Sequence, residues 1–317
     1  MVTRRELLKK LSLSASFSFV APGSFVASGF SRMTAASSMK YGYAAITWGN
    51  DVMQAIDDIA AVGFRGIQLR TGDGTLARWG DNPAALHELL AKRTLTLAAL
   101  SSGNLVIDPA REQEQLATHV SHAKFVKDAG GLYLQVIDER PKGRAIVADD
   151  YRRLGRLLTE LGKRTGDLGV PLVYHHHMNS LGEKPGEVAA VLDAADRRHV
   201  RLLFDVAHYQ QAGGDPVRGL RQYKDWLQLI HLKDVRAAGG AGEAGGAGGA
   251  GRAGGYQFVE LGQGRVDLPG VFAALRDIGY DGWAVVELDR VPEPGRTARE
   301  CAEINKRYLV DVVHVSV

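Results

Sequence analysis

Four short stretches decide the fold: VPLVYHHH at 170–177, RLLFDVAH at 201–208, LQLIHLKD at 227–234 and WAVVELD at 283–289. Each is an apolar run that ends in His, Asp or Glu, the side chains that commonly bind metal ions. His175 and Asp205 are 30 residues apart, and Asp205 and His231 are 26 apart, close to the roughly 30 residues of one βα unit in a (β/α)8 barrel. The spacing predicts that these side chains meet at the carboxyl end of one parallel barrel.

The interval from His231 to Glu287 is 56 residues, about twice that of a βα unit. A glycine- and alanine-rich insertion of 19 residues, AAGGAGEAGGAGGAGRAGG at 237–255, accounts for the excess. Almost none of its side chains can pack, which predicts a flexible loop on the same rim as the metal ligands. The loop is either a neutral surface insertion or a mobile cover over the site.

The rest of the chain from Tyr41 onward alternates apolar runs with stretches of helical period, which predicts eight βα pairs. No GxGxxG motif follows the first run, so a closed (β/α)8 TIM barrel is favoured over a doubly wound sheet. Two G-(F/Y)-x-G motifs, at 63–66 and 279–282, are expected to end a helix and begin the next strand. The predicted strands are Tyr43–Trp48, Gly66–Leu69, Thr96–Leu100, Tyr133–Ile137, Pro171–His175, Val200–Asp205, Leu227–Leu232 and Gly282–Leu288. The predicted helices are Val52–Val62, Pro83–Arg93, Ala110–Ala129, Asp149–Leu168, Lys184–Ala195, Asp215–Tyr223, Leu268–Ile278 and Thr297–Val310.

The N-terminal segment 1–38 is typical of a twin-arginine export signal and spacer. Arg4 and Arg5 precede a mildly apolar, serine-rich stretch that is too short and too interrupted to serve as a stable membrane anchor. We therefore expect export to the periplasm with the Tat machinery as a partner, and a single catalytic domain over 39–317. The alternative is a basic amphipathic helix of a cytosolic protein.

Charge and cysteine content narrow the function classes. The chain of 317 residues has a net charge of +3, and 1–38 holds five basic residues against one acidic residue, so the remainder is close to neutral. This balance argues against a nucleic-acid partner. The single Cys301 excludes a disulfide framework or a thiolate metal cluster, and it is expected to be a buried helix residue. The oligomeric state is left open, a homo-oligomer included.

The four strand ends predict one divalent metal ion, held by His175, Asp205, His231 and Glu287. Two imidazoles with two carboxylates suit Mn, Co, Zn or Fe better than Mg, which prefers oxygen ligands. His177 lies on the same side of its strand as His175 and is the alternative ligand. It could instead hydrogen-bond the substrate or hold the loop.

Further residues near these strand ends suit catalysis or substrate binding. His208 is expected to act as an acid or base near neutral pH. Lys233 could polarise a carbonyl or stabilise an enolate, or else form a salt bridge with Asp234 or Glu260. Trp48 is expected to offer an apolar wall to a sugar. Further hydroxyl contacts are expected from Gln68, Ser102, Asn104, Gln135 and Glu139.

The sequence resembles the xylose-isomerase-like TIM barrels, the sugar phosphate isomerase/epimerase superfamily, over about 41–312. The motifs that carry the resemblance are Y-H-x-H-M at 174–178, F-D-x-x-H at 204–208, H-L-K-D-V-R at 231–236, L-G-x-G-x-V-D at 261–267 and G-Y-x-G-W-x-V-V-E at 279–287. Among its branches, the motifs are most similar to the inosose dehydratases. The resemblance implies one divalent metal on strands five to eight and proton transfer beside a carbonyl of a sugar or cyclic polyol.

One departure from the family bears on the reaction. Many isomerases of the superfamily present a pair of glutamates on strands five and eight, whereas this chain has His175 on strand five and keeps only Glu287. The first expectation is an isomerase or epimerase of a small unphosphorylated carbohydrate, and the alternative is a dehydratase or lyase of a keto-inositol or keto-sugar. An endonuclease-IV-like barrel and a non-catalytic sugar-binding protein are the rivals from other classes.

Overall fold

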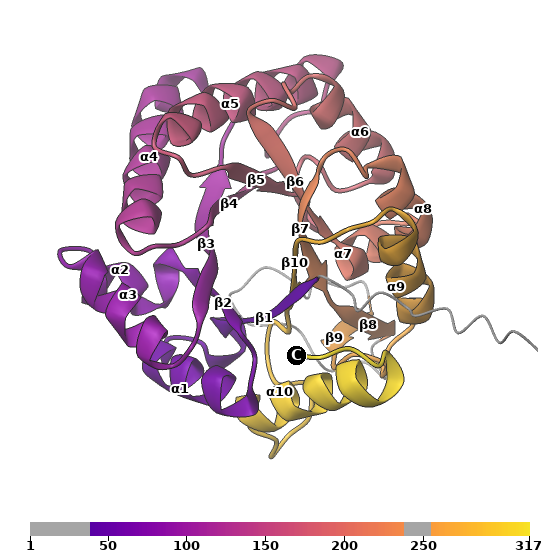
Figure 1. Cartoon of the computed structure of the whole chain (residues 1–317). Coiled ribbons are helices and arrows are strands. Elements are labelled where there is room, and N and C mark those ends of the chain that lie inside the picture. The colour runs from indigo at the N-terminus through magenta and orange to yellow at the C-terminus, as the bar shows by residue number, and fades with distance from the viewer. Residues whose placement is uncertain (1–38, 238–254) are drawn as a thin grey trace, which may run out of the picture. The chain divides into compact units, whose positions relative to one another are not determined.

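The structure is a computed structural model that describes residues 39–237 and 255–317. Eight parallel strands close into a barrel in the order β1-β10-β7-β6-β5-β4-β3-β2, and helices ring the barrel on its outside (Figure 1). The predicted (β/α)8 TIM barrel is confirmed. The barrel strands are β1 Lys40–Ala44, β2 Gly66–Arg70, β3 Thr96–Leu105, β4 Tyr133–Asp138, β5 Leu172–His175, β6 Val200–Asp205, β7 Leu227–Leu232 and β10 Trp283–Val286.

The helices follow the strands in alternation. The α-helices are α1 Val52–Val62, α2 Leu76–Trp79, α3 Pro83–Lys92, α4 Glu112–Asp128, α5 Ala148–Asp167, α6 Pro185–Asp193, α7 Val206–Gln211, α8 Pro216–Gln222, α9 Leu268–Asp277 and α10 Ala298–Arg307. Shorter helical turns are η2 Ala45–Trp48, η3 Thr71–Thr75, η4 Pro109–Arg111 and η5 Tyr308–Val312. Within 39–237 and 255–317, no helix has the length and apolar character needed to cross a membrane.

Two predictions from the sequence concern residues that the structure does not describe. The predicted export segment 1–38 and positions 238–254 of the predicted insertion lie outside the described residues. Cys301 is buried in α10, as expected.

The junction from α1 to β2 shows how the G-F-x-G motif works. Gly63 adopts φ 104° and its N–H bonds the carbonyl of Ile59, which ends the helix. Gly66 then begins β2 where a Cβ atom would lie 2.2 Å from a ring carbon of Trp283. The first glycine supplies a left-handed backbone, and the second leaves room for the Trp283 ring, which extends from β10. The predicted role of this motif is confirmed.

The barrel interior explains where the polar strand ends point. Val173, Leu203, Leu229 and Val285 belong to one buried apolar cluster, contributed by β5, β6, β7 and β10. Side chains two residues apart on a strand share a face. The residue two positions further along each chain segment is His175, Asp205, His231 or Glu287. These four therefore lie directly above the apolar cluster, at the carboxyl end of the barrel.

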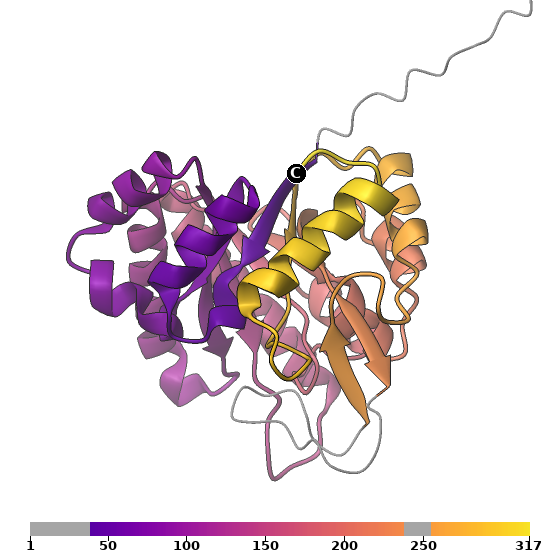
Figure 2. The ribbon, with the colours of Figure 1, turned by 90° about the horizontal axis from the view of Figure 1, so that it is seen from below.

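An antiparallel ribbon, which the sequence did not predict, follows β7 on this same rim. It pairs β8 Asp234–Ala237 with β9 Tyr256–Val259, and Figure 2 shows it at the end of the barrel to which the strands run. The prediction that Ala237 belongs to the inserted loop is wrong, because Ala237 pairs with Tyr256 as the last residue of β8. Phe258 of β9 is buried in the main apolar core, which attaches the ribbon to the barrel.

The first strand also ends earlier than predicted. β1 stops at Ala44, and Ala45–Trp48 forms the 3-10 turn η2, which closes with a hydrogen bond of 3.0 Å from Gly49 N to Ile46 O. Gly49 has φ 64°, a conformation that breaks an extended strand. Trp48 therefore sits on a turn and not on a strand end.

Candidate active site and metal centre

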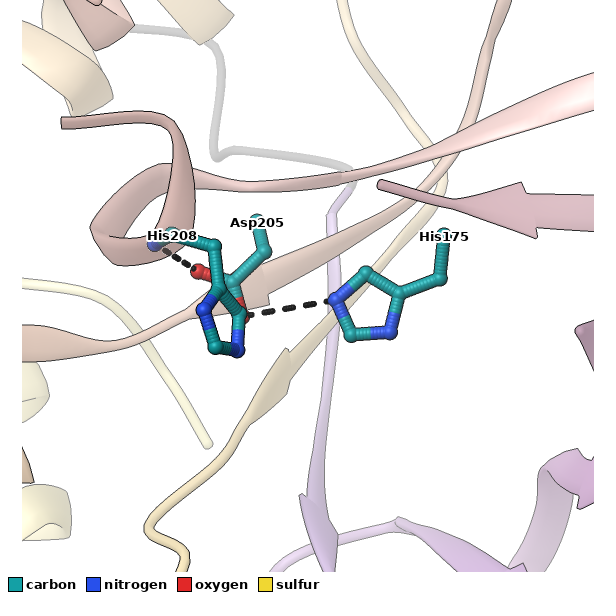
Figure 3. A group of neighbouring side chains, drawn as sticks. All are labelled: His175, Asp205 and His208. Carbon is teal, nitrogen blue, oxygen red and sulfur yellow. Dashed lines mark hydrogen bonds and ion pairs between the residues drawn. The ribbon is translucent and has the colours of Figure 1, made fainter. Parts of the chain in front are cut away.

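Asp205 lies at the centre of the candidate site. Its Oδ2 atom is 3.7 Å from His175 Nε2, 3.4 Å from His231 Nδ1 and 3.8 Å from His208 Nε2. Figure 3 shows the His175 and His208 rings turned toward this carboxylate. Glu287 joins on the other side, with Oε2 at 3.3 Å from His231 Nδ1. The structure thus brings together all four residues predicted to bind the metal.

The polar atoms that converge here have no hydrogen-bond partners of their own. His175 Nε2, Asp205 Oδ2 and His231 Nδ1 are each buried without one in the described part of the chain. Buried polar atoms are nearly always paired, so a set that faces a common point calls for a ligand. Two groups with metal-binding geometry result, His175 with Asp205 and His208, and Asp205 with His231 and Glu287. Nitrogen and carboxylate donors in this arrangement fit one divalent ion.

Asp205 is held in place by its second oxygen. Oδ1 accepts hydrogen bonds of 2.9 Å from Ala207 N and 2.8 Å from His208 N, and so caps the start of α7. A carboxylate is a favoured N-cap residue because it pairs free backbone N–H groups at a helix start. The cap fixes the rotation of the side chain, which leaves Oδ2 directed at the site.

Burial and charge set the ionisation of the site. Burial lowers the pKa of His175 to about 4, which leaves the imidazole neutral. Burial alone would raise the pKa of the Glu287 carboxyl, but His231 and Lys233 outweigh it and lower the pKa to about 2. Neutral nitrogens and ionised carboxylates are the forms that bind metal ions.

The two candidate histidines of the 174–178 motif have different surroundings. His175 faces Asp205, whereas His177 Nδ1 lies 2.8 Å from its neighbour's carbonyl, Met178 O. The His177 ring packs on the His208 ring, with centroids 3.9 Å apart. The geometry therefore favours His175 over His177 as the ligand and places His177 beside His208.

His208 is buried and stands between Asp205 and Lys233. Its Nε2 is 3.4 Å from the Lys233 ammonium, and its Nδ1 has no hydrogen-bond partner in the described residues. Burial lowers the pKa of His208 well below its usual value. A neutral imidazole at this point can accept a proton, and it can also complete the ligand group with His175 and Asp205.

Lys233 is fully buried and paired with two carboxylates. Its Nζ is 2.8 Å from Glu287 Oε1 and 2.5 Å from Asp289 Oδ1, and it lies 4.1 Å from the centroid of the Phe258 ring. Burial alone would lower the pKa of the Lys233 ammonium, but Asp289 and Glu287 outweigh it and raise the pKa. Lys233 is therefore a permanent positive charge and not a base.

The alternative partners predicted for Lys233 have other contacts. Asp234 accepts backbone N–H bonds of 2.8–3.0 Å from Val235, Gly262, Gly264 and Val266, and Glu260 pairs with Arg296. The predicted salt bridges from Lys233 to Asp234 or Glu260 are thus wrong. Asp289 was missed, although it ends the WAVVELD stretch and alternates in register with Glu287.

Of the other residues predicted to bind substrate, Trp48 and Ser102 contact helices, and Gln68 contacts one of the proposed metal ligands. The Trp48 indole donates 2.8 Å to Asp58 Oδ2 on α1 and packs edge-on against Tyr43, so it lies against the helical layer. The Ser102 hydroxyl is 2.6 Å from His119 Nδ1 and 2.7 Å from His122 Nδ1, both on α4. Gln68 is buried against His231 Nε2 at 2.9 Å.

Comparison with known proteins gives the family. Residues 56–307 match the family model described as a xylose isomerase-like TIM barrel. The chain belongs to this family. This xylose isomerase-like barrel is 29% identical over 300 residues to an inosose dehydratase of Lacticaseibacillus casei, a match that covers 86% of this chain and 96% of the relative. An inosose dehydratase of Geobacillus kaustophilus (strain HTA426) is 27% identical over 300 residues, covering 87% and 95%.

A solved structure shows the same fold. The crystal structure of the IolI protein with a bound zinc atom aligns with a TM-score of 0.71 and 23% identity, covering 87% of this barrel and 98% of that chain. The family match and the two inosose dehydratase relatives support an enzyme over a non-catalytic sugar-binding protein. They also favour the dehydratase alternative over the isomerase or epimerase that was expected first.

Proposed function

We propose that this barrel is a divalent-metal-dependent dehydratase that removes water from a keto-inositol or a closely related keto-sugar. The observation that carries the proposal is the asymmetry of the site: within residues 39–237 and 255–317, Glu287 is the one glutamate of the candidate ligand groups, and a neutral imidazole, His175, occupies the end of β5. Two inosose dehydratases, which the chain matches over nearly their whole length, support the same reaction.

The reaction breaks the C–H bond beside the carbonyl and the C–O bond on the next carbon. The electron pair of the C–H bond forms the new C=C bond, and the C–O electron pair leaves with the hydroxyl. The base then passes the proton that it took from carbon to this hydroxyl, which departs as water. A divalent ion held by His175, Asp205, His231 and Glu287 would supply Lewis acidity to the carbonyl oxygen. Among the protein groups, neutral His208 can take up the carbon-bound proton, and Lys233 supplies a fixed positive charge near the developing enolate.

The same geometry disfavours a symmetrical epimerase. That chemistry needs a proton carrier on each face of the substrate carbon, commonly a pair of carboxylates. Glu287 Oε1 is already bound to the Lys233 ammonium, and the facing position on β5 is His175. Elimination requires only one such carrier, because the proton taken from carbon can be passed to the departing hydroxyl group.

The ion we propose is Mn, Co, Zn or Fe in preference to Mg, because imidazole nitrogen is a poor partner for Mg. Metal analysis of purified protein tests this choice. We also propose that the enzyme acts in the periplasm, since 1–38 has the pattern of a twin-arginine signal.

The test is a parallel incubation of metal-loaded protein with keto-inositols and with ketohexoses in deuterated buffer. Elimination gives a product lighter by one water with new enone or dione absorbance. Isomerisation gives solvent deuterium in a product of unchanged formula. Deuterium uptake without loss of water on any keto-inositol would refute the dehydratase assignment. Lys233→Met is the matched control, because it keeps all four proposed metal ligands but removes the buried positive charge. Turnover that depends on this site should therefore be slower in the variant.

A further inference from the structure

A buried chain of hydrogen bonds joins two of the metal-binding imidazoles behind the site. His231 Nε2 lies 2.9 Å from Gln68 Oε1, Gln68 Nε2 donates 2.9 Å to Gln135 Oε1, and Gln135 Nε2 lies 2.9 Å from His175 Nδ1. The amides come from β2 and β4, and all four side chains are 0–3% exposed. Each glutamine thus has both its oxygen and its nitrogen in a hydrogen bond within this chain.

The direction of this chain determines which ring nitrogen carries a proton. The Gln68 oxygen requires a proton on His231 Nε2, which leaves a lone pair on His231 Nδ1, the atom that faces Asp205 and Glu287. The Gln135 amide donates to His175 Nδ1, so the proton of neutral His175 must be on Nε2, the atom that faces Asp205. His231 is ready to bind a metal ion in this arrangement, and His175 is not.

If both amides are flipped, His175 becomes the imidazole with a free lone pair at the site and His231 becomes the one whose site-facing nitrogen carries a proton. Only one of the two imidazoles is ready to bind a metal ion in either orientation. A head-to-tail pair of amides always donates at one end and accepts at the other. Ligation by both imidazoles requires each outer nitrogen to donate, and each glutamine must then present its oxygen outward. The two NH2 groups would face each other, and the hydrogen bond between Gln68 and Gln135 would be lost.

We propose that the Gln68–Gln135 pair is a positioning device that holds His175 and His231 in the same Nε2–H tautomer until the metal binds. Ligation through both imidazoles would require the His175 proton on Nδ1 and would break the amide–amide hydrogen bond. This inference rests on the metal site proposed above but not on the substrate.

The Gln135→Glu variant tests the idea because a carboxylate only accepts. It receives hydrogen bonds from His175 Nδ1 and from Gln68 Nε2 together, so the conflict disappears. We expect zinc to bind about tenfold more tightly than in the wild type, the equivalent of one buried hydrogen bond. A chromophoric chelator in competition for zinc measures the affinity.

A double-mutant cycle separates hydrogen-bond direction from the added charge. In Gln68→Met the amide pair is already broken, so Gln135 is free to accept from His175. Gln135→Glu should then gain only the effect of its charge, and the gain should be several-fold smaller than in the wild-type background. An equal gain in both backgrounds would overturn the proposal. Gln135→Met has no amide pair to break but also offers no acceptor to the His175 Nδ1–H group, so it should bind zinc less tightly than Gln135→Glu.

Nitrogen-15 spectra of histidine-labelled protein give a readout independent of activity. We expect both imidazoles as Nε2–H in the metal-free wild type, and His175 as Nδ1–H in the zinc-bound wild type and in metal-free Gln135→Glu. A metal-free wild type that already has His175 as Nδ1–H refutes the bridge. Absence of zinc binding in every variant refutes the metal site instead, so the two failures are distinguishable.

Discussion

Replacing Asp205 by Asn isolates its role as a metal ligand from its role in the fold. Asn keeps an oxygen that can cap α7 through Ala207 N and His208 N, and Asp and Asn are about equally good N-caps. It removes the charge and the free Oδ2 that faces three imidazoles. Loss of an outer-shell contact already weakens metal binding by about 10–100-fold, so loss of this ligand should cost at least roughly 100-fold.

That factor converts directly into stability. Zinc at a hundred times the wild-type Kd stabilises the folded protein by about 2.7 kcal/mol. A Kd raised about 100-fold reduces the same zinc concentration to about one Kd and the gain to about 0.4 kcal/mol. Urea unfolding of both proteins with and without zinc measures these gains.

Asp205→Ala provides the matched comparison, because it also removes the cap. The metal-free Ala variant should be less stable than the metal-free Asn variant by about 1 kcal/mol, while both lose the response to zinc. A full zinc-dependent gain in Asp205→Asn would show that Asp205 is not a ligand and would refute the site.

The other predictions concern charge, pH, export and the insertion. Lys233→Met should lower kcat by about 100-fold or more while zinc affinity remains within a few-fold; unchanged steady-state turnover would exclude an electrostatic role. Because burial lowers the pKa of His175 from 6.5 to about 4, the unfolded chain binds more protons between these values, so His175 alone should contribute a loss of roughly 3 kcal/mol to the metal-free protein as pH falls from 6.5 to 4. His175→Gln should flatten this dependence in urea titrations, and an identical pH profile would contradict the assignment. Arg4→Lys with Arg5→Lys should keep the protein in the cytoplasm, as cell fractionation would show, whereas periplasmic recovery would indicate another route. Replacing 238–254 by a short turn should leave turnover largely intact, and a large loss in the same assay would favour a cover over the site.

The convergence of the four proposed metal ligands could be predicted because a local sequence pattern determines where each side chain lies. Successive side chains of a strand point to opposite faces, which fixes the side of the strand that His175, Asp205, His231 and Glu287 occupy. Parallel strands of a barrel also end at the same rim. The order of the apolar and ligand residues was therefore sufficient to place all four at one end of the barrel.

The supporting residues depend on features that no local pattern encodes. The register of β3 shifts between Ser101 and Asn104, and the structure directs Ser102 to α4. The turn at Gly49 takes Trp48 off the strand. Gln68 and Gln135 come from β2 and β4, which do not pair with each other, so their contact forms only across the barrel. Asp289 lies beyond the end of β10, where no strand pattern identifies Lys233 as its partner.

The buried carboxylate of Asp234 has a consequence for engineering. By binding the backbone at Gly262, Gly264 and Val266, it ties the returning chain to the base of the β8–β9 ribbon. Asp234 pairs with Val259 at one end of the ribbon, whereas Ala237 and Tyr256, which flank the insertion, pair at the other end. Sequences of different length should be accepted between these two residues, which makes the tip of the ribbon a suitable place to graft a peptide tag or reporter without disturbing the neighbouring Lys233.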